Sequence, residues 1–299
     1  MKIRKAIITA AGFGTRFLPI SKTIQKEMLP ILNRPTIDFL VADCVAAGIE
    51  EIIFVVKESE NRLVEHFYTE YRSLRQHLEK MGKLETHADS LSFGAYDKVK
   101  FRFVDQTIAD QYGTAMPVAL AERHLKNEDA FVVLMGDDFL LNPDGSSETA
   151  KMIAYFNAHP TARGLATCLP KPTEELYKYG VADTYQENDA LYLKTLVEKP
   201  TPGTAPSNLV NISKYIFTPA VFDIIRTQTP NQASGELYIT DSITTLAKEN
   251  SVLIYEPTGT YLDAGTVSGW LKANLTVAAT NDELKQELQT FLSETKILD

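Results

Sequence analysis

A glycine-rich loop followed by cations is the first feature of the sequence that could do chemistry. Gly12 and Gly14 follow a short apolar run, and the cations Arg16, Lys22 and Lys26 come next. Glycine lets a backbone approach a ligand closely, so successive N–H groups can hold an anion. Arg forms forked hydrogen bonds to oxyanions, whereas Lys acts as a mobile point charge. The segment favours a substrate with several phosphates. The alternative is a tight strand-to-helix turn with no ligand, beside a solvated basic surface.

The loop fits neither of two familiar phosphate-binding patterns. The dinucleotide fingerprint G-x-G-x-x-G and the P-loop G-x-x-x-x-G-K-[ST] both require a second or third glycine where this chain has Phe17. The loop is therefore neither a dehydrogenase fingerprint nor a Walker motif.

Paired acids follow a strongly apolar segment in the middle of the chain. Residues 130–135 are nearly all apolar and lead directly into Gly136, Asp137 and Asp138. Two carboxylates in a triphosphate site would repel the substrate unless a cation lay between them, and Mg²⁺ prefers oxygen ligands of this kind. Asp263, which precedes Ala-Gly-Thr, is a further candidate. Each aspartate alone could instead form a turn, and Asp263 could cap a helix.

Two other polar groups could recognise a base and a sugar. Gln106 ends a strand-like run, and its amide can donate and accept at once, which suits the edge of a pyrimidine. Without a ligand, Gln106 would simply be a polar strand end. Glu198 and Lys199 also end a strand-like run. They could bind sugar hydroxyls and a sugar phosphate, or form only a surface ion pair.

Strand and helix patterns that could position these residues alternate from the start of the chain. Residues 3–10 predict a buried strand, 35–47 an amphipathic helix closed by Gly48, and 51–56 the next strand. Such a βαβ unit requires parallel strands. Helices are further predicted at 60–83, at 116–125 and from 266 onward, and strands at 100–104, 130–135, 164–169, 191–197, 209–217 and 251–256.

The pattern predicts one α/β domain over residues 1–299, with a doubly wound, mostly parallel, Rossmann-like mixed sheet. The linker-like stretch 199–208 is interpreted as a loop inside that domain, because strands flank it closely. In such folds ligands bind beyond the carboxyl ends of the strands, so the loops that carry the candidate residues should gather at that edge. The helical segment from about residue 266 could pack on a neighbouring subunit.

Composition and charge exclude several classes of function. The chain has 299 residues and a net charge of −9, which argues against nucleic acid or an anionic membrane surface as the partner. The sequence has no apolar run that could span a bilayer, and glycine and arginine interrupt the short apolar stretch after the N-terminus. We expect a cytoplasmic protein.

The sequence offers no evident protein nucleophile or redox pair. Cys44 and Cys168 lie in apolar surroundings and lack C-x-x-C spacing, which predicts two buried thiols. The five histidines fall in no motif, and the sequence shows no Ser-His-Asp or Cys-His arrangement.

A resemblance to a known family covers nearly the whole chain. The signature of the sugar-1-phosphate nucleotidylyltransferases closely resembles residues 10–31, A-A-G-F-G-T-R-F-L-P-I-S-K-T-I-Q-K-E-M-L-P-I. Later family segments resemble Y-G-V at 179–181, V-E-K-P at 197–200 and L-D-A-G-T at 262–266. The resemblance implies the nucleotide-diphospho-sugar transferase type of fold, Mg²⁺ as cofactor and a homodimer or homotetramer. It also implies transfer of UMP from UTP to glucose 1-phosphate, giving UDP-glucose and pyrophosphate.

The resemblance assigns roles residue by residue. It implies nucleotide contacts in and around the glycine loop and the central loops, by Ala10, Ala11, Gly12, Gly14, Thr15, Glu27, Gln106 and Gly113. Arg16, Lys26 and Lys199 would be catalytic through their contacts with phosphates. Asp137 and Asp263 would hold the metal, and the sugar would lie against Asp138, Gly180, Glu198 and Lys199.

Four positions depart from the family pattern, namely Thr9, Gln25, Gln111 and Tyr238. Gln111 stands where a glycine is usual and could alter base selectivity. A thymidylyltransferase, or an enzyme for another sugar phosphate, therefore stays open. So does a non-catalytic regulatory paralogue that binds a nucleotide sugar, although the charged site residues are all present.

Overall fold

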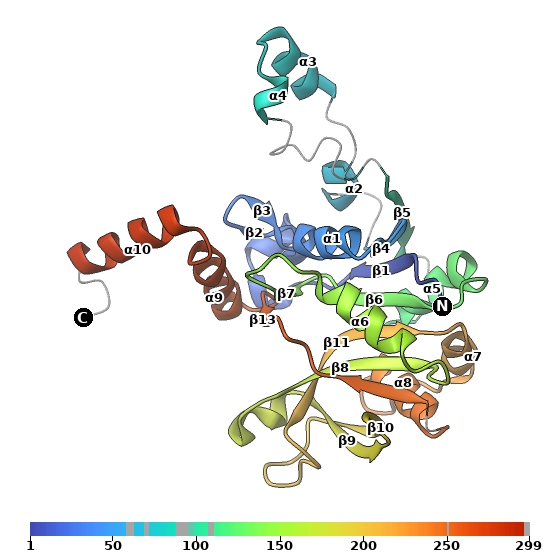
Figure 1. Cartoon of the computed structure of the whole chain (residues 1–299). Helices are drawn as coiled ribbons and strands as arrows, with labels where there is room; N and C mark the ends of the chain where they lie inside the picture. Colours follow the sequence, from blue (N-terminus) through green and yellow to red (C-terminus); the bar gives the residue numbers. More distant parts are fainter. Residues whose placement is uncertain are drawn as a thin grey trace.

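A computed structural model describes residues 1–57, 63–68, 72–87, 96, 98–106, 111–249 and 251–295. Within these residues nine strands form one mixed sheet in the order β5-β4-β1-β6-β11-β8-β12-β10-β9 (Figure 1). Their bounds are β1 (Lys5–Ala10), β4 (Glu51–Val56), β5 (Lys100–Asp105), β6 (Phe131–Met135), β8 (Gly164–Pro170), β9 (Gly180–Glu187), β10 (Ala190–Glu198), β11 (Leu209–Phe217) and β12 (Val252–Tyr255).

The half of the sheet that carries the glycine loop is parallel. β1 pairs in parallel with β4 on one side and with β6 on the other, and β5 continues the parallel order beyond β4. β11 runs antiparallel between β6 and β8, and β9 and β10 also pair antiparallel. The predicted mixed sheet is thus confirmed. Strand order reverses at β1, which is where doubly wound folds bind ligands.

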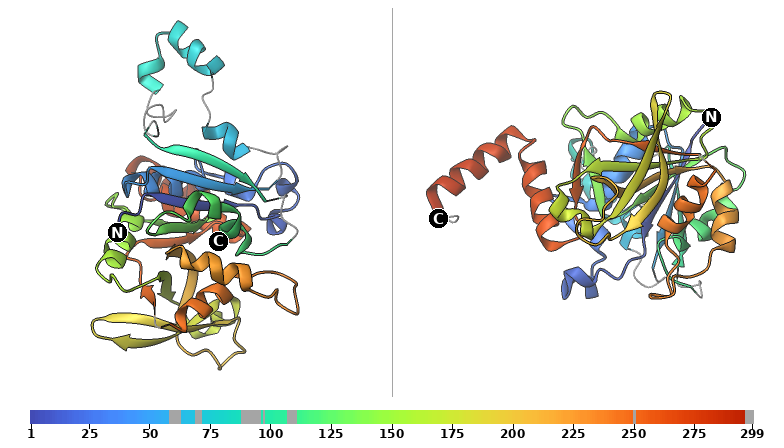
Figure 2. Two further views of the ribbon diagram at one scale, coloured as in Figure 1. Left: turned by 90° about the vertical axis from the view of Figure 1, so that its right-hand side faces the viewer. Right: turned by 90° about the horizontal axis from the view of Figure 1, so that it is seen from below.

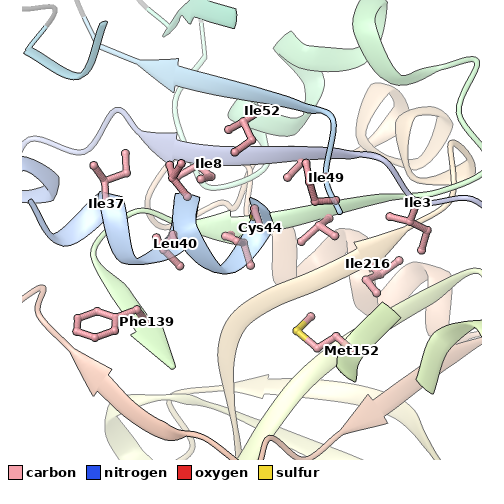
Figure 3. Packing of buried hydrophobic residues seen from close by; sticks show 14 of the residues in the cluster. Ile3, Ile8, Ile37, Leu40, Cys44, Ile49, Ile52, Phe139, Met152 and Ile216 are labelled. Atoms are coloured by element: carbon pink, nitrogen blue, oxygen red, sulfur yellow. The ribbon is translucent and has the colours of Figure 1, made fainter. Parts of the chain in front are cut away.

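Helices cover both faces of the sheet (Figure 1). On one face, α1 (Thr36–Ala46) and α6 (Glu148–Asn157) pack on alternate strand residues such as Ile8. Figure 3 shows Leu40 and Cys44 of α1 in the same cluster as Ile8, Ile52 and Phe139. On the other face, α5 (Met116–Leu125), α7 (Ala220–Thr227) and α8 (Ile239–Ala247) pack on the remaining strand residues, including Ile7. Burial on both faces explains why the parallel strands are continuous apolar runs.

A short two-stranded sheet lies beside the main sheet. Its strands, β7 (Asp138–Leu141) and β13 (Thr260–Asp263), pair antiparallel so that Asp138 lies opposite Asp263. Sequence patterns predicted neither strand. β2 (Pro30–Ile31) and β3 (Arg34–Pro35) form another small pair.

The region after β4 differs from the predicted pattern. The predicted helix over 60–83 contains α2 (Leu63–Tyr68) and α3 (Arg72–Lys80), followed by α4 (Leu84–His87), while residues 60–62 and 69–71 lie outside the described part. The stretch 199–208 joins β10 to β11, which belong to the same sheet.

The C-terminal segment is helical, as predicted, and forms α9 (Val267–Ala278) and α10 (Asp282–Thr295). Figures 1 and 2 show α10 extending away from the sheet. Within the part of the chain that the structure describes, no helix is both long and apolar enough to cross a membrane.

Candidate active site

Lys26 lies directly beneath the glycine loop. A Cβ at Gly12 would come within 3.2 Å of the Lys26 Cε, and a Cβ at Gly14 within 3.6 Å of the Lys26 Cβ. Gly14 also has φ of 61°, in the left-handed region that favours glycine. The two glycines therefore let the loop pack against the side-chain methylenes of Lys26, which begins η3 (Lys26–Met28). The Lys26 ammonium group consequently lies under the loop.

The Lys26 ammonium forms an ion pair with Asp137, 111 residues further along the chain. Glu27 Oε1 lies 3.7 Å from the same nitrogen. Burial opposes the charged form of Lys26, but Asp137 and Glu27 outweigh it and raise the pKa of the lysine. Burial likewise opposes ionisation of Asp137, yet Lys26 holds the pKa of that carboxyl below its usual range. The site therefore contains a partly buried, charged cation–carboxylate pair.

Glu27 points into the protein beside this pair. Its side chain is buried, and Oε2 has no hydrogen-bond partner among the described residues. Burial is the main cause that raises the pKa of Glu27 to about 7. Ala10 and Ala11 are also buried, whereas Thr15 and Arg16 on η1 (Thr15–Phe17) are exposed at the open side of the loop.

Asp137 and Asp263 converge on Gly265. A Cβ at that glycine would lie 2.5 Å from Asp137 Oδ2 and 3.1 Å from Asp263 Oδ1, so a side chain there would occupy the space between the carboxylates. Asp263 Oδ1 accepts a hydrogen bond from the Gly265 N–H at 2.9 Å. Asp263 is not a helix cap, because Thr266 is the residue whose side chain caps α9.

This donor set fits Mg²⁺. The described residues contain no group of three or more His, Cys, Asp or Glu side chains that could hold a metal. Two carboxylates are nevertheless what Mg²⁺ commonly takes from a protein, because phosphate oxygens and water complete its coordination.

Asp138 is directed away from the carboxylate pair. Its side chain is buried, Oδ1 bonds to Lys214 Nζ, and Oδ2 accepts from the Tyr261 hydroxyl at 3.0 Å. The sequence interpretation placed Asp138 beside the sugar, but both carboxylate oxygens have internal partners. The two acids differ in their partners, because Asp137 pairs with Lys26 whereas Asp138 pairs with Lys214. Lys214 and Tyr261 are site residues that the sequence interpretation missed.

The loop assigned to the base is held by the segment around Leu237. Gly113 has φ of 131°, and a Cβ there would lie 2.3 Å from the Leu237 carbonyl oxygen. Leu237 donates to the Tyr112 carbonyl and accepts from the Ala115 N–H, both at 2.9 Å. Gln106 follows β5 and is buried, and its Oε1 has no partner within the described residues. A buried polar atom usually has a hydrogen-bond partner, so this oxygen is a candidate acceptor for a ligand.

Aromatic rings connect the two nucleotide loops. The rings of Phe13, in the glycine loop, and Tyr112 are 5.7 Å apart between centroids, and both are exposed. Burial is the largest influence on Tyr112 and raises its pKa, while the charge of Lys26 lowers it. The contact between Phe13 and Tyr112 brings the predicted base loop to the glycine loop of the predicted phosphate site.

Gly180, Glu198 and Lys199 meet at one end of the β9–β10 pair. Gly180 lies opposite Glu198, and a Cβ on the glycine would be 3.1 Å from Glu198 Oε2. Lys199 has φ of 45° and donates its N–H to the Tyr179 carbonyl at 3.0 Å. Its side chain is 67% exposed, with Nζ 3.9 Å from Glu198 Oε1. A surface ion pair of this length contributes little to stability, which leaves both groups free for a ligand.

The group formed by Gly180, Glu198 and Lys199 lies on the same side of the molecule as Asp263. Tyr179, whose carbonyl accepts from the Lys199 N–H, packs against the same small apolar cluster as Tyr261, which shares β13 with Asp263. A cavity of about 270 Å³ opens beside the group, between η6 (Thr173–Lys178) and the loop 199–208. The predicted phosphate, metal, base and sugar residues are thus brought to one region of the molecule.

Comparisons with known proteins agree on one family. The model of the family described as "Nucleotidyl transferase" matches residues 5–280. A UTP–glucose-1-phosphate uridylyltransferase of Streptococcus pneumoniae serotype 4 is 36% identical over 296 residues, covering 97% of this chain and 95% of that protein. UTP-bound UGPase from Acinetobacter baumannii has a TM-score of 0.85 at 28% identity, covering 98% of this chain and 100% of that one. A UDP-glucose pyrophosphorylase complexed with UDP-glucose has a TM-score of 0.78 at 30% identity, with 94% and 100% covered.

Proposed function

Because the chain belongs to the nucleotidyl transferase family, and within it to the UTP–glucose-1-phosphate uridylyltransferases, we propose that it transfers UMP from UTP to glucose 1-phosphate. The products are UDP-glucose and pyrophosphate. The observation that carries this proposal is the partly buried Lys26–Asp137 pair, which lies under a glycine loop and faces Asp263 across Gly265. A cation and two carboxylates at the mouth of such a loop suit a triphosphate that binds with a metal.

The reaction needs no protein nucleophile. A phosphate oxygen of glucose 1-phosphate attacks the α-phosphorus of UTP in line, and the bond from that phosphorus to the pyrophosphate oxygen breaks. Lys199 binds the sugar phosphate, and its exposed ammonium group is free to move with it. Arg16 and Lys26 balance the charge of the leaving pyrophosphate. Catalysis rests on positioning and on charge neutralisation.

We assign Mg²⁺ to Asp137 and Asp263. When bound there, the ion neutralises phosphate charge and orients the triphosphate. The Lys26 ammonium keeps Asp137 ionised, and the Gly265 N–H orients Asp263. The absence of a side chain at Gly265 leaves the space in front of both carboxylates clear.

Base recognition falls to Gln106 and the loop at Gly113. The buried Oε1 of Gln106, which has no partner among the described residues, accepts from a base N–H, and the backbone at Gly113 lies where a bulkier residue could not fit. An amide that must be satisfied by the ligand discriminates strongly against bases with the wrong donor pattern.

The test is pyrophosphate release with Mg²⁺ and glucose 1-phosphate, with UTP, dTTP, ATP, CTP and GTP compared in parallel. We expect UTP to exceed ATP, CTP and GTP by at least about 100-fold, because mismatched bases leave buried polar groups unpaired. EDTA should abolish release, and added Mg²⁺ should restore it. Preference for dTTP would change the assignment to a thymidylyltransferase, and silence with all five would favour the regulatory paralogue.

We also propose that α9 and α10 form a contact between two copies of the chain. One side of α9 is fixed to its own subunit, since Trp270 Nε1 donates to the Pro30 carbonyl and Asn274 accepts from the Leu32 N–H. Another side exposes the apolar row Val267, Leu271 and Leu275. None of the described side chains of α10 is buried, and an isolated helix of this length is marginal in water. A second copy that covers the row and supports α10 fits both observations.

The double variant Leu271→Glu, Leu275→Glu should therefore shift the chain to a monomer, measured by size-exclusion chromatography with light scattering. Met81→Glu is the matched control, because Met81 is also an exposed apolar side chain but lies outside the C-terminal helices. A homotetramer in the unmodified chain would require an additional interface. An unchanged mass in the double variant would contradict the proposed contact.

We place the enzyme in the cytoplasm. Cys44 and Cys168 are free and buried, and burial raises the pKa of both thiols. Buried unpaired thiols are inert and are typical of proteins in a reducing compartment.

A further inference from the structure

A buried lysine outside the predicted motifs lies next to the carboxylate pair. Lys214 is on β11, within the apolar run of that strand, and is 2% exposed. Its Nζ donates to the Asp138 carbonyl at 3.1 Å and also bonds to the Asp138 carboxylate. Tyr261 completes the cluster through its hydroxyl, which donates to the other Asp138 oxygen at 3.0 Å.

This cluster joins three strands at the site. Lys214 belongs to the main sheet, Asp138 begins β7, and Tyr261 lies on β13. Asp137 immediately precedes Asp138, and Asp263 lies opposite Asp138 in the β7–β13 register. The hydrogen bonds of Lys214 and Tyr261 therefore hold β7, which Asp137 directly precedes, and β13, which ends at Asp263.

β11 is irregular at the position of Lys214. Residues 212–214 of β11 lie opposite Thr167 alone, so β11 bulges at this point. Ser213, in the bulge, has φ of 56°, a left-handed conformation that a non-glycine residue rarely adopts. Bulges near active sites commonly redirect a side chain, and strained backbone persists where function requires it.

Stability alone does not account for the cluster. An apolar pair of similar volume in place of a buried ion pair is often as stable or more stable. A buried ion pair does, however, specify one geometry, because each charge must meet its partner. In the Lys214–Asp138 pair, Asp138 is next to Asp137 in the chain and opposite Asp263 in the β7–β13 register. The pair therefore specifies the geometry of the proposed metal site.

We propose that Lys214 is a positioning residue for the metal carboxylates. Through Asp138 it holds β7 and β13 so that Asp137 and Asp263 face the same point. The inference rests on the proposed function, because the metal assignment to these two carboxylates belongs to it.

The experiment measures two properties of each purified full-length variant: the thermal midpoint, and Mn²⁺ affinity with UTP present, from the electron paramagnetic resonance of free Mn²⁺. Lys214→Met removes the charge at similar volume, and the double variant Asp138→Asn, Lys214→Met removes both charges. Lys5→Met is the matched control, because Lys5 also pairs in a partly buried position, with Glu128 at 3.0 Å, far from the site. Asp137→Asn reports on the metal site itself.

Lys214→Met should lower the midpoint by about 10 °C, since it leaves the Asp138 carboxylate buried without its cation. It should also weaken Mn²⁺ binding at least 10-fold. The double variant should regain most of the midpoint but keep weak Mn²⁺ binding, because the link between β11 and β7 is still missing. Lys5→Met should lose thermal stability while its Mn²⁺ affinity stays normal.

Three results would overturn the proposal. One is normal Mn²⁺ affinity in Lys214→Met. Another is recovery of Mn²⁺ affinity together with the midpoint in the double variant, which would make Lys214 a contributor to folding only. The third is Mn²⁺ binding that does not depend on Asp137. A failed proposed function is recognised separately, by absent pyrophosphate release from the unmodified chain.

Discussion

Replacement of Asp137 by alanine is expected to lower turnover at least about 1,000-fold while the chain stays folded. Asp137 is one of the two carboxylates that meet at Gly265, and it is the ion-pair partner of Lys26. Its loss removes half of the protein's proposed metal ligands. A metal contributes several kcal/mol of charge stabilisation in such transfers, and about 4 kcal/mol corresponds to this change in rate. Initial rates of pyrophosphate release at saturating UTP and glucose 1-phosphate measure it.

Two further variants separate the metal role from a general loss of packing. Asp137→Asn keeps the shape and an acceptor for Lys26 but removes the charge, so it should lose nearly as much turnover with a smaller loss of thermal stability. Asp183→Ala is the surface control, since Asp183 is half-exposed and pairs only loosely with Lys194 at 3.4 Å. Near-normal turnover in purified, folded Asp137→Ala would remove Asp137 from the metal site.

The strands of the central sheet could be predicted because burial on both faces leaves a continuous apolar run. β4 and β11 have the predicted bounds, as does α5 with its helical spacing. Other elements lack such a pattern. α8 (I-T-D-S-I-T-T-L-A) is rich in β-branched residues, which have low helix propensity, and packing on the sheet determines its state. β7 and β13 have four residues each and depend on one another rather than on local preference.

The site residues could be predicted where type and local context sufficed. The glycines, Lys26 and Asp137 stand in recognisable segments, but the contact between Lys26 and Asp137 joins positions 111 residues apart and follows only from the fold. The internal partners of Asp138, Lys214 and Tyr261, lie 76 and 123 residues away and likewise follow only from the fold. Lys214 did leave a trace in the sequence, because a lysine inside N-I-S-K-Y-I-F is unusual in a strand buried on both faces.

Replacement of Lys199 by alanine should lower kcat/KM for glucose 1-phosphate by about 100- to 1,000-fold, since a charged donor to a phosphate is lost at the step where charge develops. The side chain is 67% exposed and 3.9 Å from Glu198, so its removal breaks no strong internal contact. The thermal midpoint should therefore stay close to that of the unmodified chain. Steady-state kinetics with glucose 1-phosphate varied at saturating UTP give the measurement.

The backbone at Lys199 supplies a sharper comparison. Its φ of 45° costs a non-glycine residue about 1 kcal/mol, whereas glycine adopts it freely. Lys199→Gly should thus lose as much activity as Lys199→Ala but be more stable than it. If both variants kept normal kcat/KM, Lys199 would have no role toward the sugar phosphate. If Lys199→Gly were more stable than Lys199→Ala and nearly inactive, the lysine would be present for its charge, because glycine would give the more stable fold.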